Sequence, residues 1–504
     1  MNAATHPAGS AQSEQTLNVL RNRRFLALWV AQVVTQVGGN MVLYGLTVQV
    51  FGLTRSSTSV SLLILSFLVP AVIFGAVAGV YVDRIDRRLI LVATNVLRAA
   101  FFLAILFVIN DIGLILLLTA LISTLTTFFG PAEAAMIPVV VPRKQLLAAN
   151  SLHVLTLQAS FFLGFALLGP LVVNLAGQQV LLIAVGASYL VGAALCWFLP
   201  KYNPSRQDVQ PDGGHALGEA AEALGDAGTA VASTFSQLLD GLRYIRQNRT
   251  VFWPLTYLAV TASLIGVLGV LGPGFATQVL GLSEKDFVVV VLPLGVGLVM
   301  GIFALNIYGK YFSRRRGIEA GLVGLGVTLL ALSVAQGFTT RFSLGPLISL
   351  LAVVIVVAFF AGVAYAFVAV PAQTQLQEEL PANIRGRVFG VLNMLVSVAS
   401  FVPIIVVGPI ADAVGTSLVI QGSSVVVLLV AAGSILRGHS TADDTGGGGL
   451  VDVADPVSIT TSRSLTSPQT VDYMREDHDH GGAEKASPVV PGQPGPARED
   501  ADRS

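Results

Sequence analysis

The sequence predicts an all-α integral membrane protein with twelve transmembrane helices in two six-helix bundles. Hydrophobic residues make up 54% of the chain and charged residues only 12%, with a mean hydropathy of +0.75, whereas soluble proteins have about 25% charged residues. The chain also contains twelve apolar runs of the roughly 20 residues that a membrane span needs. The longest internal polar stretch separates the sixth run from the seventh. The runs are centred near residues 37, 70, 100, 124, 162, 189, 263, 297, 328, 359, 400 and 426.

This pattern divides the chain into five segments. We expect an N-terminal tail at 1–24, a six-helix bundle at 25–200, a linker at 201–249, a second six-helix bundle at 250–437 and a disordered acidic tail at 438–504. Apolar residues recur at helical spacing within the linker, which predicts an amphipathic helix lying on the membrane surface. The tail contains a run of four glycines and many acids, so it cannot bury a core.

The distribution of lysine and arginine predicts the orientation of the chain. If the N-terminus is cytoplasmic, the segments on that side hold 20 of these residues and the opposite side holds three, Arg55, Lys285 and Arg341. Cytoplasmic loops are enriched in positive charge, so both termini are expected in the cytoplasm. No small-residue cleavage site follows the first span, which favours an uncleaved anchor and a multi-pass protein held in the lipid bilayer.

The connection between the second and third spans is short and basic. It reads Gly79-Val80-Tyr81-Val82-Asp83-Arg84-Ile85-Asp86-Arg87-Arg88, and its arginines indicate a tight cytoplasmic hairpin. Gly79 permits close approach of a neighbouring helix, and Asp83 can lie at a facing helix N-terminus. The pattern Gly-x-x-x-Asp-Arg-x-x-Arg-Arg resembles the signature loop of the major facilitator superfamily, whose members are secondary transporters. An ordinary basic cytosolic loop is the alternative.

Other motifs resemble one bacterial branch of that superfamily. Leu20-Arg21-Asn22-Arg23-Arg24-Phe25, Arg98, Ala149-Asn150-Ser151-Leu152 and Arg385-Gly386-Arg387-Val388 look like the branch that contains macrolide-efflux and enterobactin-export proteins. The likeness covers about residues 17 to 437. It implies the major facilitator fold, with two pseudo-symmetric bundles, in a bacterial plasma membrane.

The fifth span carries a further motif that favours export. Gly169 and Pro170 resemble the Gly-Pro antiporter motif of facilitator drug exporters, although Val173 and Asn174 stand where that motif has Gly-Gly. Gly408-Pro409 occupies the corresponding place in the second half. The two halves therefore resemble each other, as internal repeats of a transporter should.

The first span carries a polar stripe. Gln32, Gln36, Asn40 and Tyr44 recur at every fourth residue, which places them on one helix face, and a polar face in hydrocarbon must meet protein or water. Because the resemblance implies that spans one, four, seven and ten line a central cavity, we expect the stripe to contact substrate. Interhelical hydrogen bonding is the alternative. Weaker candidates for the cavity are Ser123, Thr126, Thr127, Tyr257, Thr261 and Tyr365.

Arg98 lies about three turns into the third span, where an unpaired charge costs on the order of 3 kcal/mol. We expect either a buried partner, Glu133 or Asp83, or a side chain that reaches the cytosolic interface. The resemblance implies that such a network links the signature loop to a proton-coupled switch. The gating and coupling candidates are Gly79, Asp83, Arg84, Arg87, Arg88, Arg98, Glu133, Gly169, Pro170, Arg385 and Arg387.

These observations together predict a secondary transporter that exports a small amphiphilic compound by alternating access, coupled to protons. An uncharged or amphiphilic substrate suits spans that have no carboxylate near their midplane. Uptake, siderophore or lipid export, and a transport-inactive receptor or scaffold are the alternatives. We expect no enzymatic activity and no metal site, because no nucleophile, paired acids or metal cluster is visible at one depth and Cys196 is the single cysteine. We also expect no cofactor and no nucleic-acid partner. The protein is expected to be a monomer.

Overall fold

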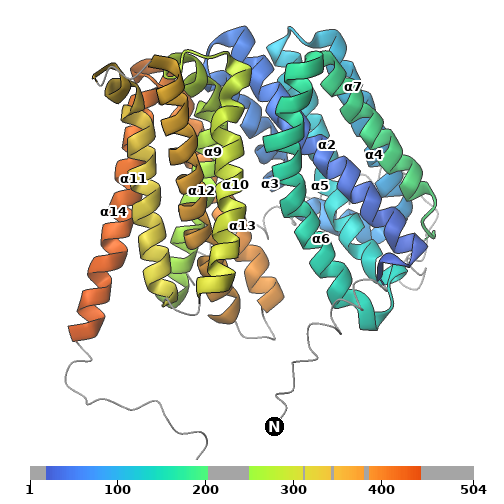
Figure 1. Ribbon diagram of the computed structural model, residues 1–504. Coiled ribbons are helices and arrows are strands. Elements are labelled where there is room, and N and C mark those ends of the chain that lie inside the picture. Colours follow the sequence, from blue (N-terminus) through green and yellow to red (C-terminus); the bar gives the residue numbers. More distant parts are fainter. Residues whose placement is uncertain (1–18, 202–248, 310–312, 342–345, 380–384, 444–504) are drawn as a thin grey trace, which may run out of the picture. The chain divides into compact units, whose positions relative to one another are not determined.

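A computed structural model describes residues 19–201, 249–309, 313–341, 346–379 and 385–443 of the 504-residue chain (Figure 1). Within these ranges every regular element is a helix and there is no strand. The expected linker helix lies outside the described residues, as do residues 444–504 of the expected tail. The last helix nevertheless ends at Asp443, so residues 438–443, predicted to begin that tail, are helical.

The N-terminal half consists of six α-helices, two short 3₁₀-helices and one π-helix. They are α2 (Arg23–Thr54), α3 (Ser57–Arg84), α4 (Arg87–Ile105), η1 (Leu106–Val108), α5 (Ile112–Val140), η2 (Arg143–Gln145), α6 (Leu146–Phe161), the π-helix η3 (Phe162–Leu168) and α7 (Gly169–Trp197). Polar residues fix the starts of several of them, because their side chains accept hydrogen bonds from first-turn amides. The N-caps of α2, α3, α4 and α5 are Asn22, Ser56, Asp86 and Asp111.

Two residues with positive φ shape the N-terminal half. Arg55 ends α2 in the left-handed conformation, with φ of 54°, so only Arg55 and Ser56 separate α2 from α3. Gly177 has φ of 86° inside α7, a conformation that glycine adopts at little cost. The chain turns there, and the continuous range Arg143–Trp197 therefore contains both the fifth and the sixth predicted span.

The C-terminal half also consists of six α-helices. They are α9 (Arg249–Gln278), α10 (Val288–Tyr308), α11 (Arg314–Arg341), α12 (Pro346–Glu379), α13 (Arg385–Val414) and α14 (Thr416–Asp443), with the 3₁₀-helix η4 (Glu284–Phe287) before α10. Gly281 and Gly415 make the turns before α10 and α14 with positive φ. Among the described residues ten helical ranges are long and apolar enough to cross a membrane, and α13 adds the apolar stretch Ala399–Val414. Each of the twelve predicted centres lies in a helix, which confirms the all-α membrane fold.

Helices pack mainly within their own half, as Figure 1 shows for α10, α11, α12 and α14. In the N-terminal half α2 packs on α7, and α3 packs on α5. Between the halves the most extensive contact joins α3 to α13. We call one end of the bundle the Asp412 end, where the connections at 55–56, 279–287 and 415 lie. The other end, with the connections at 85–86 and 141–145, is the Asp86 end.

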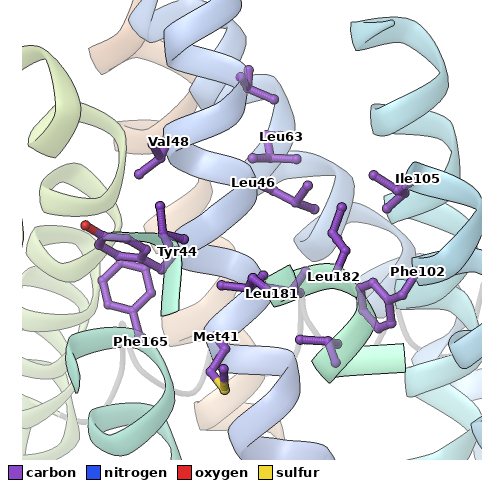
Figure 2. Packing of buried hydrophobic residues seen from close by; sticks show 14 of the residues in the cluster. Met41, Tyr44, Leu46, Val48, Leu63, Phe102, Ile105, Phe165, Leu181 and Leu182 are labelled. Carbon is purple, nitrogen blue, oxygen red and sulfur yellow. The ribbon is translucent and has the colours of Figure 1, made fainter. Parts of the chain in front are cut away.

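The largest apolar cluster surrounds α2 in the N-terminal half. Tyr44, Leu46, Phe102 and Leu181 are buried in it, and Figure 2 shows the ring of Tyr44 next to that of Phe165, which it meets edge-on. Residues of the C-terminal half, including Phe287, complete this cluster. The core of one half therefore depends on apolar side chains that the other half supplies.

Candidate functional site

The two halves meet through polar groups at the Asp412 end. Asp412 lies in the last turn of α13, and its carboxylate accepts four hydrogen bonds from the start of α3. The donors are the Ser56 hydroxyl (2.6 Å), the Ser57 amide (2.7 Å), and the amide (3.0 Å) and hydroxyl (2.6 Å) of Thr58. A carboxylate is favoured at a helix N-terminus, where amide groups lack partners within the helix. One side chain thus joins the second span to the eleventh.

Tyr44 makes a second connection at this end. Its ring stacks on Phe287, with 4.7 Å between centroids and 16° between planes, and its hydroxyl donates to the Lys285 carbonyl oxygen. Both partners lie in the connection between α9 and α10. Nearby, Arg55 Nη1 lies 3.0 Å from Glu284 Oε2, but this pair is largely exposed and such pairs contribute little. The aromatic stack and the Asp412 hydrogen bonds are the stronger contacts.

Two glycines allow the halves to approach closely. A Cβ atom on Gly408 of α13 would lie 2.7 Å from the Ser57 carbonyl oxygen and 2.9 Å from Thr58 Cα. A Cβ atom on Gly295 of α10 would overlap the ring of Phe162 in η3. The Ser61 hydroxyl oxygen is also close and can rotate away, but the two main-chain atoms of α3 cannot, so a larger residue at Gly408 would push α3 and α13 apart.

Arg98 is buried inside the N-terminal half. It is 3% exposed, which excludes the alternative in which its side chain reaches the cytosolic interface. Its guanidinium donates to Asn95 Oδ1 at 2.6 Å, to the Thr94 carbonyl oxygen at 3.3 Å and to Thr126 Oγ1 at 3.4 Å. It also lies over the rings of Phe129 (4.3 Å) and Tyr189 (4.7 Å). This combination of hydrogen bonds and cation–π contacts replaces much of the hydration that Arg98 loses.

Glu133 is the acidic neighbour of Arg98 on α5. It is 2% exposed, and its Oε1 atom has no hydrogen-bond partner among the described residues. The positive charge of Arg98 attracts the Glu133 carboxylate, which is a favourable electrostatic interaction. A buried carboxylate without hydrogen bonds is unfavourable when charged. The two predicted coupling residues are therefore neighbours, while their role in coupling stays a prediction.

The polar stripe of α2 divides into two environments. Gln32 is buried, and its Nε2 donates to the His153 carbonyl oxygen of α6 at 3.3 Å. Tyr44 is buried at the junction described above. Gln36 and Asn40, between them, are half-buried, and Asn40 Nδ2 donates to the Gln36 carbonyl oxygen at 2.8 Å. The two ends of the stripe thus hold helices together, and its centre remains the part free to meet a ligand.

The hydroxyl groups predicted on the fourth span bond mainly to backbone. Ser123 is buried, and its hydroxyl donates to the Phe67 carbonyl oxygen of α3. Thr127 is half-buried, and its hydroxyl donates to the Ser123 carbonyl oxygen at 2.9 Å, within α5. Thr126 is exposed, and its hydroxyl accepts a hydrogen bond from Arg98 Nη1. Their contact with substrate stays a prediction.

The candidates in the C-terminal half form a group of their own. The Tyr257 hydroxyl lies 2.6 Å from the Ser434 hydroxyl, which joins α9 to α14. Thr261 is buried, and the half-buried Tyr365 of α12 lies beside its hydroxyl. A cavity of about 220 Å³ in this half is lined by other residues, such as Asn306 and Thr374. None of the residues predicted to contact substrate lines it.

The signature loop is described in part. Arg87 Nη1 donates to the Ala135 carbonyl oxygen of α5 at 3.0 Å, and the Arg88 guanidinium lies 4.8 Å from the centre of the Trp197 ring. Both arginines therefore brace helices of the N-terminal half. Gly79, Asp83 and Arg84 are placed only as backbone in α3, and Arg385 and Arg387 only as backbone at the start of α13. The predicted contact between Asp83 and α13 lies outside the described side chains.

Gly169 and Pro170 mark the junction of η3 and α7. Gly169 is the first residue of α7, and Pro170 follows it. A Cβ atom on Gly169 would lie 3.0 Å from Tyr44 Cβ, and one on Gly164 of η3 would lie 2.7 Å from Asn40 Cβ. The glycines of this motif thus bring the fifth span into close contact with the polar stripe of α2.

Several members of the site were not predicted from the sequence. Asp412, in the last turn of its span, was not singled out, nor was the phenylalanine before α10 that stacks on Tyr44. Asn95 and Tyr189 were not foreseen as partners of Arg98. One signal was available for Asp412, because the second and eleventh spans are antiparallel and both end on an aspartate near a following turn. No group of three potential metal ligands exists among the described residues.

Comparison with known proteins identifies the family. The sequence model described as the Major Facilitator Superfamily matches residues 28–404. The chain is 25% identical over 403 residues to YfiS, an MFS-type transporter of Bacillus subtilis, covering 79% of this chain and 90% of that protein. It is 23% identical to the multidrug efflux pump Tap of Mycolicibacterium fortuitum, covering 74% and 86%, and 21% identical to macrolide efflux protein A of Streptococcus pyogenes, covering 78% and 91%.

Solved structures support the same fold. The nucleoside transporter NupG aligns with a TM-score of 0.61 at 12% identity, covering 82% of this chain and 98% of that one. A bacterial homologue of the lysosomal transporter Spinster, in an inward-facing and unoccupied conformation, aligns with a TM-score of 0.59 at 15% identity, covering 84% and 98%. The chain therefore belongs to the Major Facilitator Superfamily and is a multi-pass membrane transporter.

Proposed function

We propose that this transporter exports a small amphiphilic compound from a bacterial cytoplasm by alternating access, driven by proton entry. The observation that carries the proposal is the closure of the Asp412 end. There Asp412 bonds to Ser56, the N-cap of α3, and to the first two residues of that helix, and Tyr44 stacks on Phe287. Contacts of this kind, concentrated at one end of two rigid halves, are expected of one state of a transporter that opens alternately to each side.

The charge distribution supports the direction. If the Asp86 end faces the cytoplasm, as the excess of arginine and lysine on that side favours, the Asp412 end faces outward. The described state is then closed to the outside and accepts its substrate from the cytoplasm. Two of the relatives described above are an efflux pump and an efflux protein by name, which supports export over uptake.

The chemistry of the first span supports an amphiphilic substrate. Gln36 and Asn40 offer amide groups on a half-buried helix face, and the fully buried titratable residues Arg98 and Glu133 lie near each other rather than on separate faces. Neutral hydrogen-bonding groups among apolar side chains suit a largely apolar ligand with a few polar groups. A macrolide such as erythromycin is therefore the first probe, and a catechol siderophore is the second.

Transport in everted membrane vesicles tests the proposal. Vesicles that contain the protein, with an acidic lumen, should accumulate labelled erythromycin, and an ionophore that removes the pH gradient should abolish the accumulation. Vesicles without the protein are the control. Siderophore accumulation without macrolide accumulation would contradict the drug substrate and leave export in place. Accumulation of neither compound, together with binding of one of them, would contradict the transporter function in favour of a receptor.

A further inference from the structure

Asp412 connects the two halves through four hydrogen bonds to a single side chain. It lies on the exposed side of the last turn of α13, yet both oxygen atoms of its carboxylate are hydrogen-bonded. Oδ1 accepts from the Ser57 amide, and Oδ2 accepts from the Ser56 hydroxyl and from the amide and hydroxyl of Thr58. All four donors belong to the N-terminal half, and the acceptor belongs to the C-terminal half.

These hydrogen bonds satisfy the first turn of α3 from outside the helix. The N-cap of α3, Ser56, accepts from the Ser59 amide, which leaves the amides of Ser57 and Thr58 without a partner in their own half. The Asp412 carboxylate supplies that partner, and hydrogen bonds to a charged acceptor are stronger than neutral ones. Separation of α3 from α13 would expose these groups and remove all four bonds together.

The two helices joined by Asp412 run in opposite directions. Helices α3 and α13 are antiparallel in the predicted topology, so α3 ends where α13 begins. Asp83 is the second-last residue of α3, and Asp412 is the third-last residue of α13, so an aspartate lies in the last turn of each helix. Two rigid helices that pivot against each other separate at one end as they approach at the other.

We propose that Asp412 is the gate residue of the Asp412 end. Asp412 holds the first turn of α3 when that end is closed. When the transporter switches, this contact breaks and α3 and α13 separate at that end. The proposal rests on the alternating-access function above and adds the residue that decides how long the Asp412 end stays closed.

A carboxylate at a helix N-terminus within one half provides the matched control. Asp111 is the N-cap of α5 at the same end, and it accepts from the Leu114 amide at 3.0 Å. Asp111→Asn removes a charge from a helix N-terminus without touching a contact between the halves. A general effect of lost capping charge would therefore appear in both variants, whereas a gating effect appears only in Asp412→Asn.

The experiment measures distances between the halves at both ends of the full-length protein. Spin labels on cysteines at Leu53 and Leu418 report on the Asp412 end, and labels at Leu147 and Ile307 report on the Asp86 end. All four side chains are exposed, and the native Cys196 is buried. Asp412→Asn should raise the ratio of open to closed molecules at the Asp412 end about tenfold, which is about 1.4 kcal/mol. Asp111→Asn should leave this ratio within about twofold.

The comparison of the two variants decides the gate role. An Asp412→Asn ratio equal to that of Asp111→Asn would overturn it. Melting temperatures of the same samples confirm that each variant is folded. If wild-type labels show one fixed distance under every condition, alternating access itself fails, which is a different result from failure of Asp412.

Discussion

Gly408→Ala should open the Asp412 end. The added Cβ atom would lie 2.7 Å from the Ser57 carbonyl oxygen and 2.9 Å from Thr58 Cα, well inside van der Waals contact. Because these atoms are main chain, α3 and α13 must move apart. Overpacking of this kind costs about 1–3 kcal/mol, and it acts only on the state in which the two helices are in contact. The population that is open at this end should therefore rise by about fivefold to 150-fold.

Thiol labelling measures this change. Ser57 is 1% exposed and its hydroxyl oxygen has no hydrogen-bond partner among the described residues, so Ser57→Cys is a mild substitution at the closed interface. A membrane-impermeant maleimide added to intact cells should label this cysteine slowly in the parent protein. Gly408→Ala should increase the labelling rate in proportion to the open population. Labelling from outside the cell also tests which side the Asp412 end faces.

The control is an alanine where space exists. A Cβ atom on Gly422 of α14 meets nothing within 4 Å, and alanine there favours the helix by roughly 1 kcal/mol relative to glycine. Gly422→Ala should leave the labelling rate unchanged. Equal labelling rates in the Gly408→Ala and parent proteins would refute the claim that the closed Asp412 end depends on direct backbone contact between α3 and α13.

Three other substitutions follow from the site. Glu133→Gln keeps the shape of the side chain but removes its interaction with the Arg98 charge, and it should remove the dependence of transport on an imposed pH gradient. Asn40→Ala should weaken erythromycin binding up to about tenfold by loss of one hydrogen bond, whereas Val33→Ala should not, as binding titrations would show. Tyr44→Phe should raise Ser57→Cys labelling about twofold to tenfold, because it removes the hydrogen bond to Lys285 and keeps the aromatic stack.

The fold could be predicted because the membrane leaves few options. A chain in hydrocarbon must satisfy its backbone hydrogen bonds internally, so each apolar run of sufficient length becomes a helix, and all twelve predicted centres lie in helices. Irregular helical segments and turns depend on other interactions. The π-helix Phe162–Leu168 and the turn at Gly177 arise from packing against neighbouring helices and from a single positive φ. Hydropathy is insensitive to both.

Part of the site could be predicted because a charge buried in a membrane span is costly without partners. A charge as deep as Arg98 requires partners, and the sequence pointed to Glu133, which is indeed its neighbour. The sequence did not show that Asn95, Thr126 and two aromatic rings complete the environment of Arg98, because these residues come from different helices. Periodicity placed the polar stripe on one face but could not tell which members are buried by neighbouring helices.

Asp412 illustrates the limit most clearly. In the sequence it is one acid at the end of an apolar run, and such acids usually face solvent. Its importance comes from Ser56, Ser57 and Thr58, more than 350 positions away along the chain. Only the antiparallel pairing of α3 with α13 brings these residues together, and that pairing is a property of the closed state.

Distances at both ends of the same protein test the central claim, alternating access, most directly. Labels at Leu53 with Leu418 and at Leu147 with Ile307 are measured in wild-type protein in bilayers, with and without erythromycin and at two values of the lumen pH. Alternating access requires the two distances to change in opposite senses, so that the Asp412 end widens as the Asp86 end narrows. Two distances that rise and fall together, or an Asp412 end that never opens, would contradict the account.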